Sequence, residues 1–122
     1  MRPDKYILDL NGEPVAVNDV DIWAEWFERA SRDGSRILKQ DFVEGEDGAA
    51  HFSLKDRVGV STVFLGLDHQ WGDGPPILWE SLVSGTSLDG QMQRYTSRAD
   101  ALRGHDALLE EVRAAYDHER PP

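Results

Sequence analysis

RVGVSTVFLGL, residues 57–67, is the stretch of this chain that decides the fold. β-Branched and aromatic residues dominate it, which is typical of a strand. Both alternating sets of side chains are largely apolar: Val58/Val60/Thr62/Phe64 on one side, and Ser61/Val63/Leu65/Leu67 on the other. A strand that is apolar on both sides usually lies inside a sheet covered on both faces. We therefore predict that residues 57–67 form an interior strand.

The segments around this strand predict the rest of a sheet. RILKQDFV (36–43), ILWESLV (77–83) and QMQRY (91–95) suit strands. The connection over 68–76 must be a loop, because it contains two glycines and two prolines. Short connections between consecutive strands favour an antiparallel meander.

KYILDLNGEPVAV, residues 5–17, predicts a hairpin ahead of that sheet. Tyr6, Leu8 and Leu10 alternate on one face, and Asn11-Gly12 is a strong turn signal. Pro14 cannot donate to a ladder, so the second arm is an edge strand or merely extended.

Two amphipathic helices are predicted, over 19–32 and 97–117. In the first, Asn18 or Asp19 can cap the start, and Gly34 is a natural stop. Its apolar stripe is Ile22, Trp23, Trp26, Phe27 and Ala30.

The second helix opens with the capping-box-like Ser97-x-x-Asp100. His105 lies on its apolar stripe with Leu102, Leu109, Val112 and Tyr116. Gly104 beside it costs helix stability, roughly 1 kcal/mol against alanine, and a close backbone contact would explain it.

The fold class that follows is α+β: an antiparallel meander of about four to five strands with both helices packed on one face. The 122 residues suit one domain, 1–122. We expect residues 1–4 and 118–122 to fray and 44–56 to form a flexible loop.

Composition excludes several classes of function. The net charge is −10, and the 13 basic residues are scattered, so non-specific nucleic-acid binding and docking on an anionic membrane are not expected. Zero cysteines exclude disulfides and thiolate metal sites. No apolar run is long enough to span a bilayer, and the first residues do not resemble a signal peptide. The acidity indicates either a solubilising surface or a surface complementary to a basic partner.

No strong catalytic motif is present, so we expect no cofactor and no metal. The one suggestive constellation is Asp68, His69, Glu80 and His105, which could bind a divalent metal or perform acid–base chemistry if the side chains converged. Each also has a structural explanation. Asp68 could cap the glycine-rich turn, His69 could face solvent, Glu80 could pair with Arg94, and His105 could be a hydrogen-bonded core histidine.

Trp71 is the other unusual residue, because it lies in a loop among Asp, Gly and Pro. We expect it to fold back onto the sheet. If it projects instead, it is a candidate binding anchor, since exposed tryptophans are enriched at interface hot spots. The candidate binding residues are Trp71, Asp73, Asp68 and His69.

STVFLGLDHQWGDGPPILWESLVSG (61–85), followed by QRYTSRADALRGH (93–105), resembles a family of small proteins from tailed bacteriophages and prophages, especially those of actinobacteria. The start, residues 5–30, is similar to that family's opening. VSTVFLGLDH (60–69) is the most specific part, and 44–56 is the least matched. The resemblance implies a phage origin and a site in the bacterial host cytoplasm, and it transfers no catalytic residue.

Two hypotheses of function remain. The first is a small acidic, non-enzymatic phage-type accessory protein that binds a host or phage protein, with a host-takeover or anti-defence role. Such a partner could be basic, and self-association stays open. The second is a small metal-dependent hydrolase that uses Asp68, His69, Glu80 and His105, which requires those side chains to converge in an open pocket.

Overall fold

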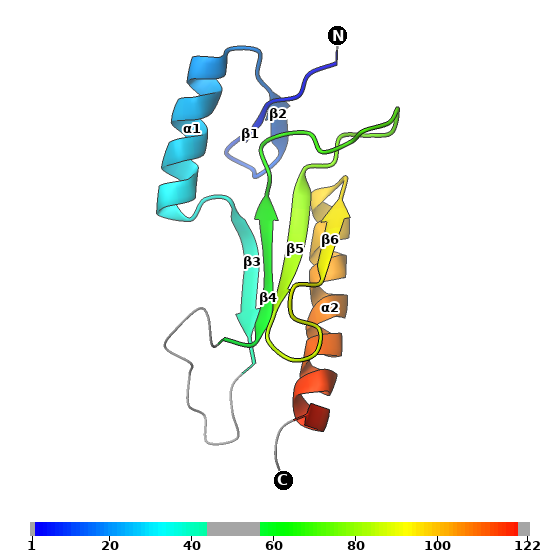
Figure 1. The fold of residues 1–122 in the computed structure, drawn as a ribbon. Helices are drawn as coiled ribbons and strands as arrows, with labels where there is room; N and C mark the ends of the chain where they lie inside the picture. Colours follow the sequence, from blue (N-terminus) through cyan, green and yellow to red (C-terminus); the bar gives the residue numbers. More distant parts are fainter. Residues whose placement is uncertain (1, 44–56, 120–122) are drawn as a thin grey trace.

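The computed structural model describes residues 2–43 and 57–119 of the chain. It is an α+β fold, as predicted, with a four-stranded antiparallel sheet, a separate two-stranded hairpin and two helices (Figure 1). The elements in chain order are β1 (Tyr6–Leu8), β2 (Pro14–Ala16), α1 (Val20–Asp33), β3 (Ile37–Phe42), β4 (Gly59–Phe64), β5 (Trp79–Ser84), β6 (Met92–Tyr95) and α2 (Arg98–Glu119).

The sheet is the predicted meander, with strand order β3-β4-β5-β6 and every neighbouring pair antiparallel. β4 lies between β3 and β5, so its interior position is confirmed. In the register of β4 with β5, Thr62 is opposite Ser81 and Val60 is opposite Val83. These four side chains are all buried, and they mark the face of the sheet that holds the core.

α2 covers that face and contacts all four strands. On the opposite face, Ser61 and Val63 of β4 are only partly buried, and Leu82 and Met92 are 42% and 49% exposed. Within residues 2–43 and 57–119 no helix lies on this second face. The expectation that β4 is covered on both sides was therefore wrong for the described chain: its apolar pattern reflects one buried face and one partly exposed face.

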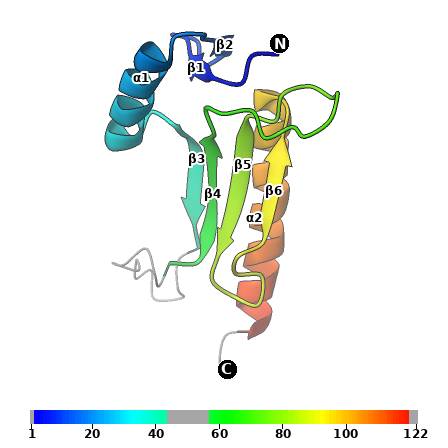
Figure 2. The same cartoon turned by 45° about the horizontal axis from the view of Figure 1, so that its top comes forward.

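α1 lies beside the β1–β2 hairpin, beyond the end of the sheet where β3 begins and β4 ends (Figure 2). Its ends follow the predicted signals, because the Asp19 carboxylate accepts from the N–H groups of Asp21 and Ile22, and Gly34 ends it at φ +82°. Trp26 meets Phe64 of β4 edge-on, with ring centroids 5.8 Å apart. α1 thus joins the core through the end of the sheet, whereas α2 packs on its face, so the expectation that both helices pack on one face was wrong for α1.

The β1–β2 hairpin forms as predicted, but its turn is longer than two residues. Gly12 has φ +77°, and the N–H of Gly12 donates to the Asp9 carbonyl over 3.0 Å. The Asp9 carboxylate accepts from the N–H groups of Asn11 and Glu13. Tyr6 and Leu8 pack against the core, while Leu10 is fully exposed in the turn.

Both ends of the described chain make contacts with the rest of the fold. The Asp4 carbonyl accepts from the N–H of Asp68, and Arg2 forms an ion pair with the carboxylate of Asp68. At the other end, α2 continues to Glu119, whose carboxylate accepts from the N–H and the hydroxyl of Ser87. The fraying expected at 2–4 and 118–119 stays a prediction. The expected loop at 44–56, and the expected fraying at residues 1 and 120–122, lie outside the described residues.

Gly104 is explained by a close contact, as its position in a helix suggested. Tyr95 of β6 lies directly against it, so that a Cβ at position 104 would overlap the tyrosine ring and hydroxyl. The glycine therefore lets β6 and α2 approach closely, and this offsets its cost in helix stability.

Gly104→Ala should destabilise the protein by about 1–3 kcal/mol, because the added methyl displaces Tyr95. An exposed helical glycine would show the reverse, a gain of about 1 kcal/mol. Urea unfolding measures the change, and Ala107→Gly on the exposed face of α2 is the control, which should lose about 1 kcal/mol. Stabilisation by Gly104→Ala would contradict the packing described here.

Candidate functional site

The four residues of the metal hypothesis have separate partners. Asp68 is 6% exposed at its side chain and forms an ion pair with Arg2 over 3.1 Å. Its Oδ1 accepts from the N–H groups of Gln70 and Ile77. It thus closes the turn after β4, which is the structural role considered for it. His69 makes a 2.9 Å hydrogen bond from Nδ1 to the carbonyl of Leu67, within its own turn.

Glu80 pairs with Arg94, its cross-strand neighbour on β6, over 3.0 Å. His105 lies inside the molecule, where its hydrogen bonds go to Thr62 and Asp41. In the described part of the chain, no three His, Asp or Glu side chains are grouped as a metal site. The convergence that the metal-dependent alternative requires is absent from these four residues.

His105 is the centre of a chain of buried polar groups between α2 and the sheet. Its Nε2 lies 2.7 Å from Oδ2 of Asp41 on β3, and its Nδ1 lies 2.6 Å from the hydroxyl of Thr62 on β4. The Thr62 hydroxyl lies 2.5 Å from that of Ser81 on β5. The Tyr95 hydroxyl on β6 donates to Ser81 over 3.0 Å. Every strand of the sheet contributes one member.

One set of proton positions gives every group in this row of buried side chains a hydrogen-bond partner. The Asp41 carboxylate accepts from Nε2–H of His105, which leaves Nδ1 as an acceptor. Thr62 then donates to Nδ1, Ser81 donates to Thr62, and Tyr95 donates to Ser81. Each group makes the bonds that its burial requires, since an unpaired buried polar group costs about 1–3 kcal/mol.

An acid, an imidazole and a hydroxyl in a row are also the parts of a nucleophilic triad. Here His105, Thr62 and Ser81 all have 0% exposure, and only Asp41 reaches the surface, with 35% of its side chain exposed. A nucleophile must approach a substrate atom within about 3–3.5 Å. Sealed between α2 and the sheet, these hydroxyls cannot do so in this conformation. This row of hydrogen-bonded side chains, the buried polar chain, is therefore a structural element.

Sequence reasoning found His105 but missed Asp41, Thr62, Ser81 and Tyr95. A signal for two of them was present: Thr62 and Ser81 are the polar members of otherwise apolar alternating sets in neighbouring strands. Antiparallel pairing of those strands places the two hydroxyls together, opposite the inward-facing histidine. Asp41 carried no such signal, because β3 has a mixed pattern.

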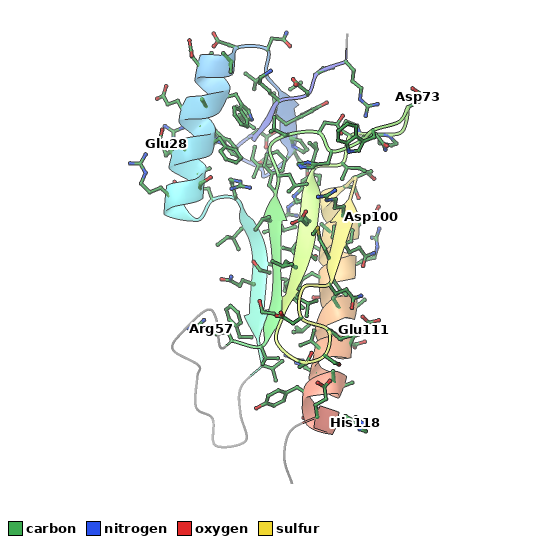
Figure 3. The ribbon with its side chains drawn as sticks, viewed as in Figure 1. Glu28, Arg57, Asp73, Asp100, Glu111 and His118 are labelled. Atoms are coloured by element: carbon green, nitrogen blue, oxygen red, sulfur yellow. The ribbon has the colours of Figure 1, made fainter. Side chains whose placement is uncertain are left out.

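Trp71 does not fold back onto the sheet, and that expectation was wrong. Its side chain is 98% exposed, whereas Trp79 in the core is 1% exposed. It lies in the β4–β5 loop, residues 65–78, which extends away from the sheet (Figure 1). Asp73, close to Trp71 in sequence, lies at the outer end of this loop (Figure 3).

The base of the β4–β5 loop is held by the N-terminal segment. Tyr6 donates its N–H to the Gly66 carbonyl over 2.9 Å, and Asp68 donates to the Asp4 carbonyl over 2.9 Å. Within the loop, the Gln70 side chain accepts from the N–H of Gly72 and donates to the Pro75 carbonyl. The loop therefore presents Trp71 from a hydrogen-bonded base.

Searches of known protein families, of curated proteins and of solved structures find no match to this chain. Among the helices described, none combines the length and the apolar character needed to cross a bilayer.

Thr62→Val should destabilise the fold by about 1–3 kcal/mol, because it keeps the shape of the side chain but leaves Nδ1 of His105 without a donor. Thermal or urea unfolding measures the loss. Thr96→Val makes the same chemical change at an exposed position and should stay within about 0.5 kcal/mol of the wild type. Equal losses of unfolding free energy in the two variants would show that the buried polar chain adds no stability.

Alkaline pH tests Tyr95, which lies at the end of the buried polar chain opposite Asp41. Burial raises the pKa of the Tyr95 phenol above its ordinary value, although its hydrogen bond to Ser81 acts in the opposite direction. A raised folded-state pKa gives stability that is complete below the unfolded value of about 10 and is lost as the pH rises through the folded value.

Unfolding free energies measured from about pH 8 to about pH 11 should therefore fall more steeply for the wild type than for Tyr95→Phe. Parallel profiles for the two proteins would contradict this environment for Tyr95.

Proposed function

We propose that this protein acts by binding another protein, without catalysis, through the β4–β5 loop with Trp71 at its centre. The observation that carries the proposal is the 98% exposure of Trp71 on a loop whose base is fixed by Asp68 and the N-terminal segment. A fully exposed indole buries no apolar area in the isolated protein, so it does not stabilise the fold. It has a large apolar area to bury against a partner.

The hydrogen bonds within the β4–β5 loop favour binding, because they hold the loop in one conformation before a partner docks. Asp68 accepts from two N–H groups across the loop, and the Gln70 side chain spans its inner part. Pre-organisation of this kind reduces the entropy lost when a partner docks. Tryptophan is also among the residue types most enriched at interface hot spots.

Charge indicates the character of the partner. The chain carries a net charge of −10, and Asp73 lies near Trp71 at the exposed end of the loop. We propose a partner with an apolar pocket for the indole and a basic rim around it. The resemblance to phage proteins supports a host or phage protein as that partner, met in the bacterial host cytoplasm, with a host-takeover or anti-defence role.

Affinity capture from host-cell lysate tests the proposal with three immobilised proteins. The wild type should retain a partner that Trp71→Ala loses, by tenfold or more, because the central anchor is gone. Leu10→Ala is the matched control: Leu10 is equally exposed but lies in the hairpin turn. Its capture should be unchanged, and all three proteins should keep the same melting temperature.

Retention by the wild type should also weaken as salt rises, since charge complementarity is screened. The proposal fails if no protein is captured above background, or if Trp71→Ala captures the same partner as strongly as the wild type.

A further inference from the structure

A small cavity of about 210 Å³ lies at the end of the sheet where the β1–β2 hairpin, the start of β3 and the start of α2 come together. Phe64 and Trp79, both core residues, form part of its lining, and Leu8 adds a further apolar wall. Arg36 and Arg98 also line it, and no Asp or Glu does. The cavity thus combines an apolar floor with two cations.

No carboxylate lines this cavity to balance its two cations, although the chain has a net charge of −10. Elsewhere in the described residues, Arg2, Arg32, Arg94 and Arg103 each form an ion pair with a carboxylate. In the same part of the chain, Arg36 and Arg98 form no ion pair with a carboxylate, and neither do the exposed Arg29 and Arg113.

Arg36 is held in place without a counter-ion. Its Nε donates to the Phe64 carbonyl over 2.9 Å, and Nη1 donates to the Ser31 hydroxyl over 3.0 Å. The guanidinium stacks 4.2 Å from the centre of the Phe27 ring. Partial burial lowers the pKa of this guanidinium, so its positive charge is incompletely solvated and would be stabilised by an anion.

Arg98 completes the rim from the first turn of α2. Within residues 2–43 and 57–119 its side chain makes no hydrogen bond or ion pair, and its Nε lies beside Gly12. Gly12 has φ +77°, a conformation that favours glycine, and it places the hairpin turn against this arginine. The guanidinium is therefore free to bind a ligand.

We propose that this cavity binds the oxyanion head, a phosphate or a carboxylate, of a small ligand with an apolar body. A guanidinium group donates charge-assisted hydrogen bonds to either oxyanion. A volume of about 210 Å³ suits a small ligand, such as a single ring with its acidic group. The site is separate from the β4–β5 loop and does not depend on the protein-binding role proposed for it.

NMR titration of the full chain tests this site with phenyl phosphate, benzoate and inorganic phosphate as probes, and with benzyl alcohol as the uncharged control. We expect phenyl phosphate or benzoate to cause saturable shifts at Gly12, Leu38 and the Trp79 indole. The stronger of the two identifies the preferred oxyanion. Inorganic phosphate should bind more weakly, because it lacks the apolar body.

Arg98→Gln should weaken binding by roughly tenfold or more, because it removes a charged donor. Arg113→Gln removes the same charge from an exposed position on α2 and should leave the affinity unchanged. Arg98 is chosen over Arg36, whose bonds to Phe64 and Ser31 also support the fold. The proposal is overturned if neither acidic ring compound binds saturably, if benzyl alcohol binds equally well, or if both variants keep the wild-type affinity.

Discussion

The hydrogen-bonded contact of His105 with Thr62 and Asp41 is the constraint on which the rest of the fold depends. An imidazole in the middle of an apolar helix face must find partners for both ring nitrogens. The sheet supplies these partners from two different strands, so both ring nitrogens are hydrogen-bonded in only one position of α2 along the sheet. Apolar packing alone would tolerate small shifts, whereas a fully paired buried network specifies a single arrangement.

This polar chain lies between two apolar clusters. One contains Val60, Val83, Leu108, Leu109 and Val112, and the other contains Phe64, Leu78, Trp79, Tyr95 and Ala101. The second cluster also receives Tyr6, Leu8, Trp26 and Leu38, so it joins the hairpin and α1 to the sheet. Both surfaces to which we assign binding, the β4–β5 loop and the arginine-rimmed cavity, are at that end. The buried polar chain therefore supports the end of the sheet where both proposed surfaces lie, and it contributes no residue to either.

Periodicity and local signals predicted most of the fold. The order of strands, the ends of α1, the pairing of Glu80 with Arg94 and the inward position of His105 could all be predicted from the sequence. The position of α1 could not, because its apolar stripe shows that it packs but not against what. The base of the loop that carries Trp71 is held by contacts of Arg2 and Asp4 with Asp68, which are distant in sequence. Local composition around Trp71 carries no trace of those contacts.

His105→Ala tests most directly whether the residue that stabilises the fold is separate from the loop proposed to bind a partner. Melting temperature and partner capture are measured on the same preparation. We expect a melting temperature lower by about 5 °C or more, with partner capture lost only to the extent that the protein unfolds. An unchanged melting temperature with abolished capture would contradict it, because His105 would then belong to the functional site.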